Sequence, residues 1–356
     1  GINLIDLKPV IPYFRERTLS LGGEIIPKEE WPSHPRNVLP DEFRNLPPNA
    51  FFHTFLGSNN PLSAPQEWMN EDQFIHDISV HEWLNKKGFS DELVDLAYNL
   101  NISHGYSAKD VSVLMLMFVN AFAASQSRLG FQTSLVAEGG NIRIAEEMAN
   151  NLKHEVLLNK EVTSIDLSQD SAKVSCDDGT SFSADRIICS LPFSVLEGIS
   201  IYPKIMGPQS QAIKSLKSQK INMLHLVPKK PFWENDGMSP NMYTDQLAGM
   251  ILSQRQASSP EKVDSLTVWL RGPIAERLDR MDQNEAIASV IQSIEDLRPS
   301  AKGQLEVAAY HSWFLNPYSK GDWAYWGPGQ IKEFGREISK PHHRLHFCGE
   351  HTAIAN

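Results

Sequence analysis

The C-terminal run from Arg344 to Thr352 holds the residues whose types and spacing could best support chemistry. Its apolar residues predict a short strand, and Gly349 and Glu350 follow where that strand should end. Ligands of open α/β sheets bind at the carboxyl ends of strands, and a glycine there lets the backbone approach a ligand closely. A helix beginning after Gly349 would favour an anion such as a phosphate. An ordinary strand-to-helix turn, with Thr352 as a cap, explains the same residues.

A second group of candidate residues is aromatic. Trp313, Trp323, Tyr325 and Trp326 all lie between positions 313 and 326. Aromatic side chains in strands mostly pack in a core, but an aromatic wall can also hold an amine through shape, desolvation and the ring quadrupole. The residues alone leave both roles open.

The sequence gives weaker evidence for a metal site or a catalytic nucleophile. His104, His225, His342 and His343 have no partner at the spacing of metal ligands, so we predict no metal site. A Gly-x-Ser-x-Gly motif, which marks one kind of nucleophilic serine, does not occur in the sequence.

Composition excludes several classes of protein. The 356 residues suffice for two or more folding units, and 41% apolar with 21% charged residues is typical of globular proteins. A net charge of −10 without basic clusters argues against nucleic acid as a partner. Cys176, Cys189 and Cys348 show no paired spacing, so reduced thiols and a cytoplasmic location are the default expectation. The longest apolar run, at Val113–Val119, is too short to span a membrane.

Helical patterns dominate the first third of the chain. Residues 1 to about 75 predict short helices and ordered loops. Ser79 stands three residues before Glu82, as in a capping box that opens a helix, and Ser107 before Asp110 is a weaker version. The second of these helices should run from Val111 to about Ser125 and be internal, because it is apolar on nearly every side.

Mixed strands and helices follow from Glu138 onward. Gly139 and Gly140 precede a predicted short helix over Ile144–Leu152, and Asp178-Gly179 is a strong hairpin signal. The predicted strands are Val156–Leu158, Val162–Ile165, Lys173–Cys176, Ser181–Ser183, Arg186–Leu191, Ile221–Val227, Ser265–Arg271, Leu305–Trp313 and Arg344–Phe347. The strand over Arg186–Leu191 should be buried. An amphipathic helix is expected over Glu285–Leu297. This order of elements favours an α/β or α+β mixed fold.

Five segments, in order, resemble one known family, the flavin-dependent amine oxidases. Phe347–Ala353, with the sequence Phe-Cys-Gly-Glu-His-Thr-Ala, is similar to the family's closing flavin-binding motif. The other matching segments are Glu138–Ala145, Val162–Ile165, Asp178–Pro192, and the pair Pro231–Trp233 with Asn316–Gly329. Phe232–Gly237 and Asn241–Asp245 further resemble bacterial flavin monoamine oxidases, which are related to L-amino-acid oxidases.

The resemblance implies a two-domain fold. Residues 1–131, rich in helices, and 201–312 would form a substrate domain with a mixed sheet flanked by helices. Residues 132–200 and 313–356 would be parts of an FAD-binding domain. The family's N-terminal Rossmann unit and its C-terminal end have no counterpart in this sequence, so we expect the FAD-binding domain to be incomplete, with most diphosphate contacts missing.

The resemblance also implies the cofactor site. FAD would contact Gly139, Gly140, Val162, Pro192, Trp313, Gly349, Glu350 and Thr352. Trp313 and Trp323 would lie near the flavin or its pocket. No cysteine stands near Gly321, where relatives with covalent flavin carry one, so the FAD should be non-covalent.

Met223 stands where the family often has a lysine that binds a water beside the flavin. The nearest lysine is Lys220. In a strand over Ile221–Val227, Met223 would share a face with Ile221 and His225, whereas Lys220 would point to the other face. We therefore expect the lysine to be replaced.

The implied activity is oxidation of an amine C–N bond to an imine, which hydrolyses to a carbonyl product. O₂ or another acceptor would reoxidise the flavin, and with O₂ as acceptor peroxide is released. The substrate would be a small amine or amino acid, and a homodimer is compatible with the family. An L-amino-acid oxidase or another flavin oxidoreductase is the first alternative, with Arg15 or Arg17 as suspects for binding a carboxylate. An inactive fragment or a non-catalytic scaffold is the alternative of a different class.

Overall fold

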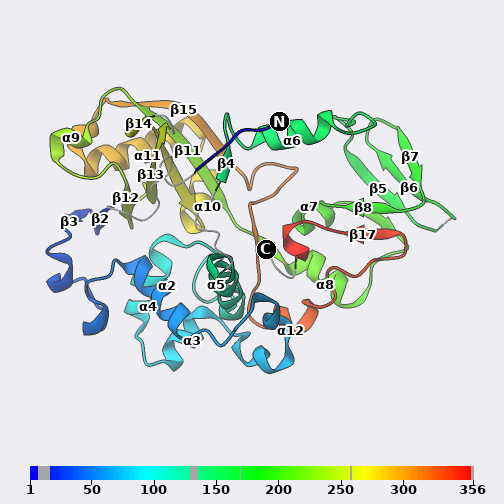
Figure 1. The fold of residues 1–356 in the computed structure, drawn as a ribbon, viewed down its shortest axis with the longest axis horizontal. Coiled ribbons are helices and arrows are strands. Elements are labelled where there is room, and N and C mark those ends of the chain that lie inside the picture. Colours follow the sequence, from blue (N-terminus) through cyan, green and yellow to red (C-terminus); the bar gives the residue numbers. More distant parts are fainter. Residues whose placement is uncertain (7–16, 129–134, 169, 257–258, 354–356) are drawn as a thin grey trace.

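The computed structural model describes residues 1–6, 17–128, 135–168, 170–256 and 259–353. One half of the molecule contains a large sheet above a group of helices, and the other half contains several small sheets with short helices (Figure 1). The mixed architecture predicted from the order of elements is confirmed.

The large sheet has seven strands in the order β15-β11-β14-β13-β12-β2-β3. Its strands are β2 (Thr18–Leu21), β3 (Glu24–Ile26), β11 (Ile221–Pro228), β12 (Met242–Thr244), β13 (Met250–Gln256), β14 (Ser259–Arg271) and β15 (Leu305–Ser312). Neighbouring strands are antiparallel except β12 and β2, which are parallel. The N-terminal strands β2 and β3 were not predicted, because they are too short to show periodicity.

The two faces of this sheet contact different layers. Along β14, Val268 and Leu270 pack in a core with helices α10 (Pro273–Asp279) and α11 (Gln283–Leu297). Trp269, which lies between them in the chain, packs against the other core, which the helical layer shares. Successive strand residues point to opposite faces, so this alternation places α10 and α11 on one side and the helical layer on the other.

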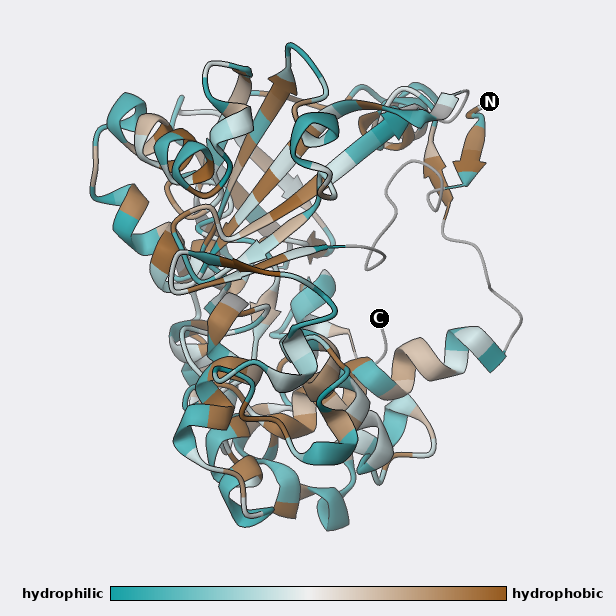
Figure 2. Cartoon of the chain, turned by 90° about the vertical axis from the view of Figure 1, so that its left-hand side faces the viewer, coloured by the Kyte–Doolittle hydropathy of each residue, from teal (hydrophilic) through white to brown (hydrophobic). Residues whose placement is uncertain are grey.

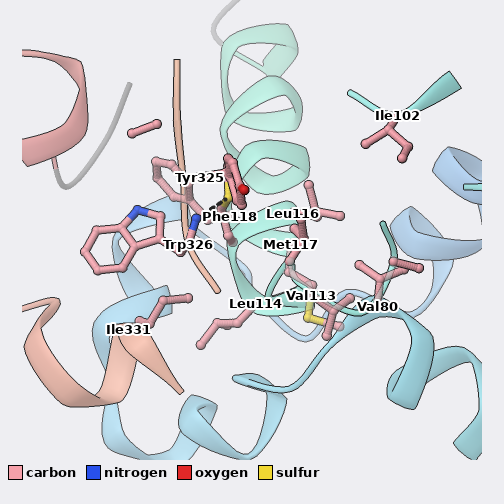
Figure 3. Close-up of a cluster of buried hydrophobic side chains, with 14 of the residues drawn as sticks. Val80, Ile102, Val113, Leu114, Leu116, Met117, Phe118, Tyr325, Trp326 and Ile331 are labelled. Atoms are coloured by element: carbon pink, nitrogen blue, oxygen red, sulfur yellow. Dashed lines mark hydrogen bonds between the residues drawn. The ribbon is translucent and has the colours of Figure 1, made fainter. Parts of the chain in front are cut away.

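The helical layer is built around α5 (Val113–Arg128). Its first turns are buried on all sides, with Leu114, Met117 and Phe118 packed near Trp326 and Ile331 (Figure 3). The predicted internal helix is therefore confirmed. Around it lie α2 (Pro48–Ser58), α3 (Val80–Lys86), α4 (Asp91–Ala97) and the 3-10 helices η1 (Trp31–Ser33), η2 (Asp41–Phe43), η3 (Pro65–Met69), η4 (Glu71–His76) and η5 (Asn99–Asn101).

The two predicted helix caps had different outcomes. The hydroxyl of Ser79 accepts a hydrogen bond from the Glu82 N–H at 3.0 Å and caps α3, as predicted. The prediction that Ser107 caps the next helix was wrong. The Ser107 N–H donates to the Asp110 carboxylate at 2.8 Å, which closes a turn, and α5 begins only at Val113.

Small sheets make up the other half. The strands β5 (Val162–Asp166), β6 (Ala172–Cys176), β7 (Ser181–Ala184) and β9 (Ser200–Tyr202) form one sheet, β8 (Ile187–Cys189) pairs with β17 (Leu345–Phe347), β1 (Leu4–Asp6) with β4 (Leu135–Ala137), and β10 (Lys217–Ser218) with β16 (Ala324–Tyr325). The remaining helices are α6 (Ile142–Asn150), α7 (Phe193–Leu196), α8 (Gly207–Ser215), α9 (Trp233–Asp236), α12 (Gln330–Phe334), η6 (Pro299–Ala301) and η7 (Glu350–Thr352).

Sequence predictions for this half were mostly confirmed. The Asp178-Gly179 hairpin joins β6 and β7, with Ala172 opposite Ala184. Two predictions were wrong. Val156–Leu158 is not a strand, and all three side chains are exposed. The strand over Arg186–Leu191 is not buried on both faces, since Ile188 is 77% exposed. Figure 2 shows apolar residues on the β1–β4 pair beside the N-terminus, and Leu4 and Leu135 of this pair are also exposed.

Length and apolarity together decide whether a helix can cross a bilayer. Within the part of the chain that the structure describes, no helix satisfies both conditions.

Candidate active site

Two parallel strands define the first part of the candidate site. β8 and β17 pair in register from Ile187 opposite Leu345 to Cys189 opposite Phe347. The Cys348 N–H donates to the Cys189 carbonyl at 2.9 Å, so the segments that follow β8 and β17 leave the sheet at the same edge. Ligands of α/β sheets bind at such carboxyl ends.

A cavity of about 100 Å³ lies at this edge, and we call it the strand-end cavity. Its lining residues are Ser190, Pro192, Phe193, Ser194, Leu216, Ser218, Asp322, Ala324, Gly349, Glu350 and His351. The structure thus brings together three residues predicted to contact the cofactor, Pro192, Gly349 and Glu350. They meet because each follows the end of a paired strand.

Gly349 needs to be a glycine at this position. Its φ of 112° lies in a region that side chains strongly disfavour, and a Cβ there would meet the His351 ring at 3.2 Å. The absence of a side chain leaves the backbone open toward the cavity. This geometry fits the close approach of a planar or phosphate-bearing cofactor.

The residues after Gly349 anchor the turn. The Glu350 carboxylate accepts a hydrogen bond from the Ala324 N–H at 3.1 Å, which ties η7 to β16. Partial burial raises the pKa of the Glu350 carboxyl. The Thr352 hydroxyl donates to the Gly349 carbonyl at 3.0 Å and is 8% exposed, so Thr352 closes the short helix and does not line the cavity. The predicted helix after Gly349 is thus only one 3-10 turn.

His351 lines the strand-end cavity and packs against the core. Its ring packs edge-on against Phe193 with 4.4 Å between centroids, and it is 7% exposed. Burial lowers the pKa of His351 to about 4, so the ring is neutral at physiological pH.

A second cavity, of about 210 Å³, shares Ala324, Glu350 and His351 with the first. We call it the tryptophan cavity; its lining residues are Trp68, His104, Met115, Phe118, Val119, Trp323, Ala324, Trp326, Glu350, His351 and Ala353. The Trp323 indole N–H donates to the Ser103 carbonyl at 3.1 Å, which fixes the ring in the wall. Trp326 is 5% exposed and packs in the core, edge-on against Trp68 and tilted against Phe334.

A third cavity, of about 430 Å³, lies between the large sheet and the helical layer. We call it the sheet–helix cavity. It is lined by Arg17, Asn49, Phe52, His53, Leu56, Ala97, Tyr98, Ser103, His104, Leu116, Val119, Asn120, Ala123, Tyr243, Met250, Leu252, Trp269 and Arg271. It shares His104 and Val119 with the tryptophan cavity, so the three cavities are neighbours in a row, each sharing wall residues with the next.

His104 stands at the boundary of the last two cavities. Its ring centroid is 5.7 Å from that of Trp323, and its Nδ1 is buried without a hydrogen-bond partner among the described residues. Burial, and then the positive charge of Arg271, lower the pKa of His104 to about 3. The imidazole is therefore neutral and able to accept a hydrogen bond at Nδ1.

Other predicted site residues lie outside these cavities. Gly139 and Gly140 are exposed in the turn before α6, and Val162 begins β5. The Trp313 ring packs edge-on against His311, with 4.6 Å between centroids. None of these residues lines the three cavities, so their predicted contacts with a cofactor stay predictions.

Met223 lies on β11 opposite Trp269 of β14 and opposite His311 of β15. Residues directly opposite one another in antiparallel strands share a face. Met223 is therefore on the same face as Trp269, which lines the sheet–helix cavity. Lys220 forms an ion pair with Glu276 of α10 at 3.3 Å, which agrees with its predicted direction toward the other face.

Sequence reasoning missed most of the sheet–helix cavity. From the sequence, Arg17 was named only as a possible carboxylate-binding residue, and His104 was given no functional role. Arg271, Trp269 and Tyr243 were not named. The sequence did contain a pattern that could have identified one pair. Trp269 and Arg271 are two residues apart in a strand, so their side chains share a face. An arginine at the end of an otherwise apolar strand could have been flagged.

Across the described ranges of the structure, no group of three or more His, Cys, Asp or Glu side chains is placed to hold a metal ion.

Relatives of known function match the chain. An L-amino-acid oxidase of Bothrops jararacussu is 23% identical over 228 residues, which are 61% of this chain and 46% of that protein. The flavin-containing amine oxidase A of Equus caballus is 25% identical over 314 residues, covering 84% of this chain and 58% of the relative. The chain thus spans about half the length of the curated relatives it matches.

Solved structures share the fold. Cyclohexylamine oxidase from Brevibacterium oxydans superposes with a TM-score of 0.75 at 17% identity, covering 100% of this chain and 78% of that one. Putrescine oxidase bound to putrescine gives a TM-score of 0.72 at 18% identity, covering 100% of this chain and 80% of the other. At these identities the likeness shows the fold alone.

The match to a family covers nearly the whole chain. The family described as flavin containing amine oxidoreductase matches residues 10–355, which include all three cavities' lining residues. The chain therefore belongs to the flavin containing amine oxidoreductase family.

Proposed function

We propose that this chain belongs to an FAD-dependent enzyme that oxidises the C–N bond of a small amine or amino acid. The observation that carries the proposal is the row of three neighbouring cavities from the strand ends to the space under the large sheet. His104 and Trp323 stand where a cofactor space and a substrate space would meet. When bound, the flavin supplies the two-electron acceptor for the amine.

We assign the cofactor to the strand-end and tryptophan cavities. Pro192, Gly349 and Glu350 would hold it at the sheet edge, with Trp323 beside it. Gly139, Gly140, Val162, Trp313 and Thr352 remain predicted contacts or supports of the same cofactor. None of the lining residues of the three cavities is a cysteine, which supports non-covalent FAD.

The chain's own residues would position the amine and exclude water. Trp269 and Trp323, with 6.4 Å between ring centroids, give an apolar wall that desolvates a neutral amine. The neutral His104 ring can accept a hydrogen bond from the amine N–H at Nδ1. Met223, on the same sheet face, contributes no acid or base, so we propose that the amine is oxidised without a lysine at that position.

We further propose the domain division expected from the sequence. Strands β2 and β3, from residues 1–131, complete the sheet formed by β11–β15, which supports one substrate domain built from 1–131 and 201–312. β8, from 132–200, pairs with β17, from 313–356, which supports one cofactor domain. Leu4–Asp6 is an exception, because it pairs with Leu135–Ala137.

One specific observation favours the amino-acid alternative. Two arginines, Arg17 and Arg271, line the sheet–helix cavity, where a substrate carboxylate could be held. A non-catalytic scaffold would show no redox chemistry. Reduction of bound flavin by a substrate would therefore distinguish either enzyme from a scaffold.

The test is spectroscopic. The purified protein, reconstituted with excess FAD, should show a flavin absorbance that survives gel filtration and is bleached anaerobically by a substrate from a panel of amines and L-amino acids. Readmitting O₂ should restore the colour and release peroxide. A protein that stays colourless after refolding with FAD would contradict the enzyme proposal. Light scattering on the same sample would test the expected homodimer.

A further inference from the structure

A fourth pocket lies beside the strand-end cavity, with which it shares Ser194, Leu216 and Ser218. Its volume is about 580 Å³, which is within the usual range for a small-molecule site. Four of its lining residues are lysines, namely Lys214, Lys217, Lys220 and Lys320. We call it the lysine pocket, and the proposed function gives it no role.

The lysine pocket is positively charged although the chain as a whole is acidic. Two glutamates, Glu197 and Glu276, line it beside the four lysines, so positive charges exceed negative ones by two. The chain has a net charge of −10, and neither the strand-end cavity nor the tryptophan cavity has a lysine or arginine among its described lining residues. An anion would therefore be attracted to the lysine pocket and repelled by the carboxylates of those two cavities.

Three of the four ammonium groups are available to a ligand. Lys220 forms the ion pair with Glu276 described above. Lys214, Lys217 and Lys320 are exposed, and they form no ion pair within the ranges that the structure describes. The pocket therefore offers several separate point charges that no carboxylate neutralises by direct contact.

Lys320 lines the pocket at a cost in backbone strain. Its φ of 50° lies in the left-handed region, which favours glycine. The Ser194 hydroxyl donates to the Ser319 carbonyl at 3.0 Å and so holds the preceding residue in place. The Lys320 Nζ lies 4.0 Å from the position that a Cβ at Gly198 would take, so the side chain reaches across to the end of α7. A lysine where a glycine would be less strained suggests a function for its charge.

The lining favours phosphate over carboxylate. Arginine, whose planar guanidinium matches a carboxylate, does not occur among the described lining residues, whereas lysine binds phosphate oxygens as a point charge. The four lysines come from α8, from β10, from the residue before β11 and from the loop before β16. Because their charges are spread over four segments, a ligand with more than one charged group can contact more of them than a single phosphate can.

We infer that the lysine pocket binds a di- or triphosphate group, at a site separate from the cavities assigned to the cofactor and the amine. Such a group occurs in inorganic polyphosphate and in nucleoside polyphosphates. Tyr106 and Phe314 also line the pocket and are 44% and 37% exposed, so each offers a ring on which a nucleobase can stack.

Titration calorimetry with inorganic triphosphate, in a buffer without divalent cations, tests the site. The wild type should bind triphosphate at least about tenfold more tightly than citrate, a carboxylate that is also highly charged. Equal binding of the two anions, or binding of neither, would overturn the inference. ATP then distinguishes the two sources: tighter binding of ATP than of triphosphate assigns the pocket to a nucleotide, and equal binding assigns it to the phosphate chain alone. Both results support the pocket.

Variants locate the binding site. Lys217→Met should weaken triphosphate binding about fivefold, because one charge-assisted contact is lost. Lys302→Met, at an exposed lysine outside the pocket, is the matched control and should bind as the wild type does. Equal weakening by both variants would show non-specific attraction to surface charge and would overturn the inference.

Lys320→Gly separates binding from folding. It removes a charge from the pocket and relieves the strain at a positive φ, so triphosphate binding should weaken about fivefold while the urea midpoint stays the same or rises. Unchanged triphosphate binding in both Lys217→Met and Lys320→Gly would remove the anion from this pocket. The measurement needs no flavin and no redox step, so its result is independent of the proposed oxidation.

Discussion

The side-chain amide of Gln219 bonds both polar groups of the Gly105 backbone. Its Oε1 accepts from the Gly105 N–H at 2.6 Å, and its Nε2 donates to the Gly105 carbonyl at 3.1 Å. Gln219 is 1% exposed and lies between β10 and β11. Because Gly105 directly follows His104, this pair of bonds fixes the loop that separates the tryptophan cavity from the sheet–helix cavity.

Replacing Gln219 by leucine should therefore destabilise the protein. Gly105 would keep a buried N–H and carbonyl without partners, at about 2–4 kcal/mol for the two groups. Urea denaturation would measure this loss. Gln283→Leu, in the exposed first turn of α11, is the control and should change the free energy of unfolding by less than about 0.5 kcal/mol. Similar stabilities of the two variants would contradict the role of Gln219.

Gly321→Ala should disturb the segment that leads to Trp323. Gly321 has a φ of 134°, and a Cβ there would clash with the Ser218 Cβ and lie 3.1 Å from the Gln219 carbonyl oxygen. We expect a loss of about 2–4 kcal/mol in the free energy of unfolding, from backbone strain and overpacking together. Gly303→Ala isolates the strain, because its φ is 70° and its Cβ would meet no atom within 4 Å. Equal losses in both variants would show that the contact with Ser218 is unimportant.

The buried, neutral His351 should make the folded protein less stable at low pH. Its pKa is lowered from 6.5 to about 4 in the folded protein, so below about pH 6.5 the unfolded chain binds a proton that the folded protein does not. The free energy of unfolding should fall as the pH drops from about 6.5 toward 4, by an amount on the order of 2–3 kcal/mol.

His351→Phe should flatten this pH dependence, whatever its effect on stability at neutral pH. The measurement is urea denaturation at about pH 7.5 and about pH 5, on either side of the ordinary histidine pKa. The exposed His154→Phe is the control and should keep the wild-type slope. An unchanged slope in His351→Phe would show that the ring is not buried in its neutral form.

Trp323 and Trp313 should differ in their effect on catalysis. Trp323 lines the tryptophan cavity, whereas Trp313 lines none of the three cavities described above. Trp323→Leu should slow anaerobic reduction of bound flavin about tenfold or more, because the substrate loses its positioning wall. Trp313→Leu should mainly weaken FAD retention. Rapid mixing and FAD titration would measure the two effects, and an equal slowing of reduction by both variants would contradict this assignment.

Strands, turns and helix caps were predicted well where the residues that determine them lie close together in the sequence. The strand at Ile221 shows alternation, the Asp178-Gly179 turn has its own hairpin chemistry, and Ser79 caps its helix through a residue only three positions away. Predictions failed where residues far apart in the sequence determine whether a strand can form. Val156–Leu158 has the apolar composition of a strand, but no neighbouring strand pairs with it among the described residues.

The sequence by itself determined the family, the mixed fold, most strands and helices, and the glycine turn at the end of β17. These depend on residues close together in the chain, where spacing and turn chemistry are readable. Only the tertiary structure decided which residues share a cavity. Arg17, His104 and Arg271 come from three distant segments, and they meet because the sheet closes over the helical layer. That contact depends on long-range packing, which short-range periodicity does not report.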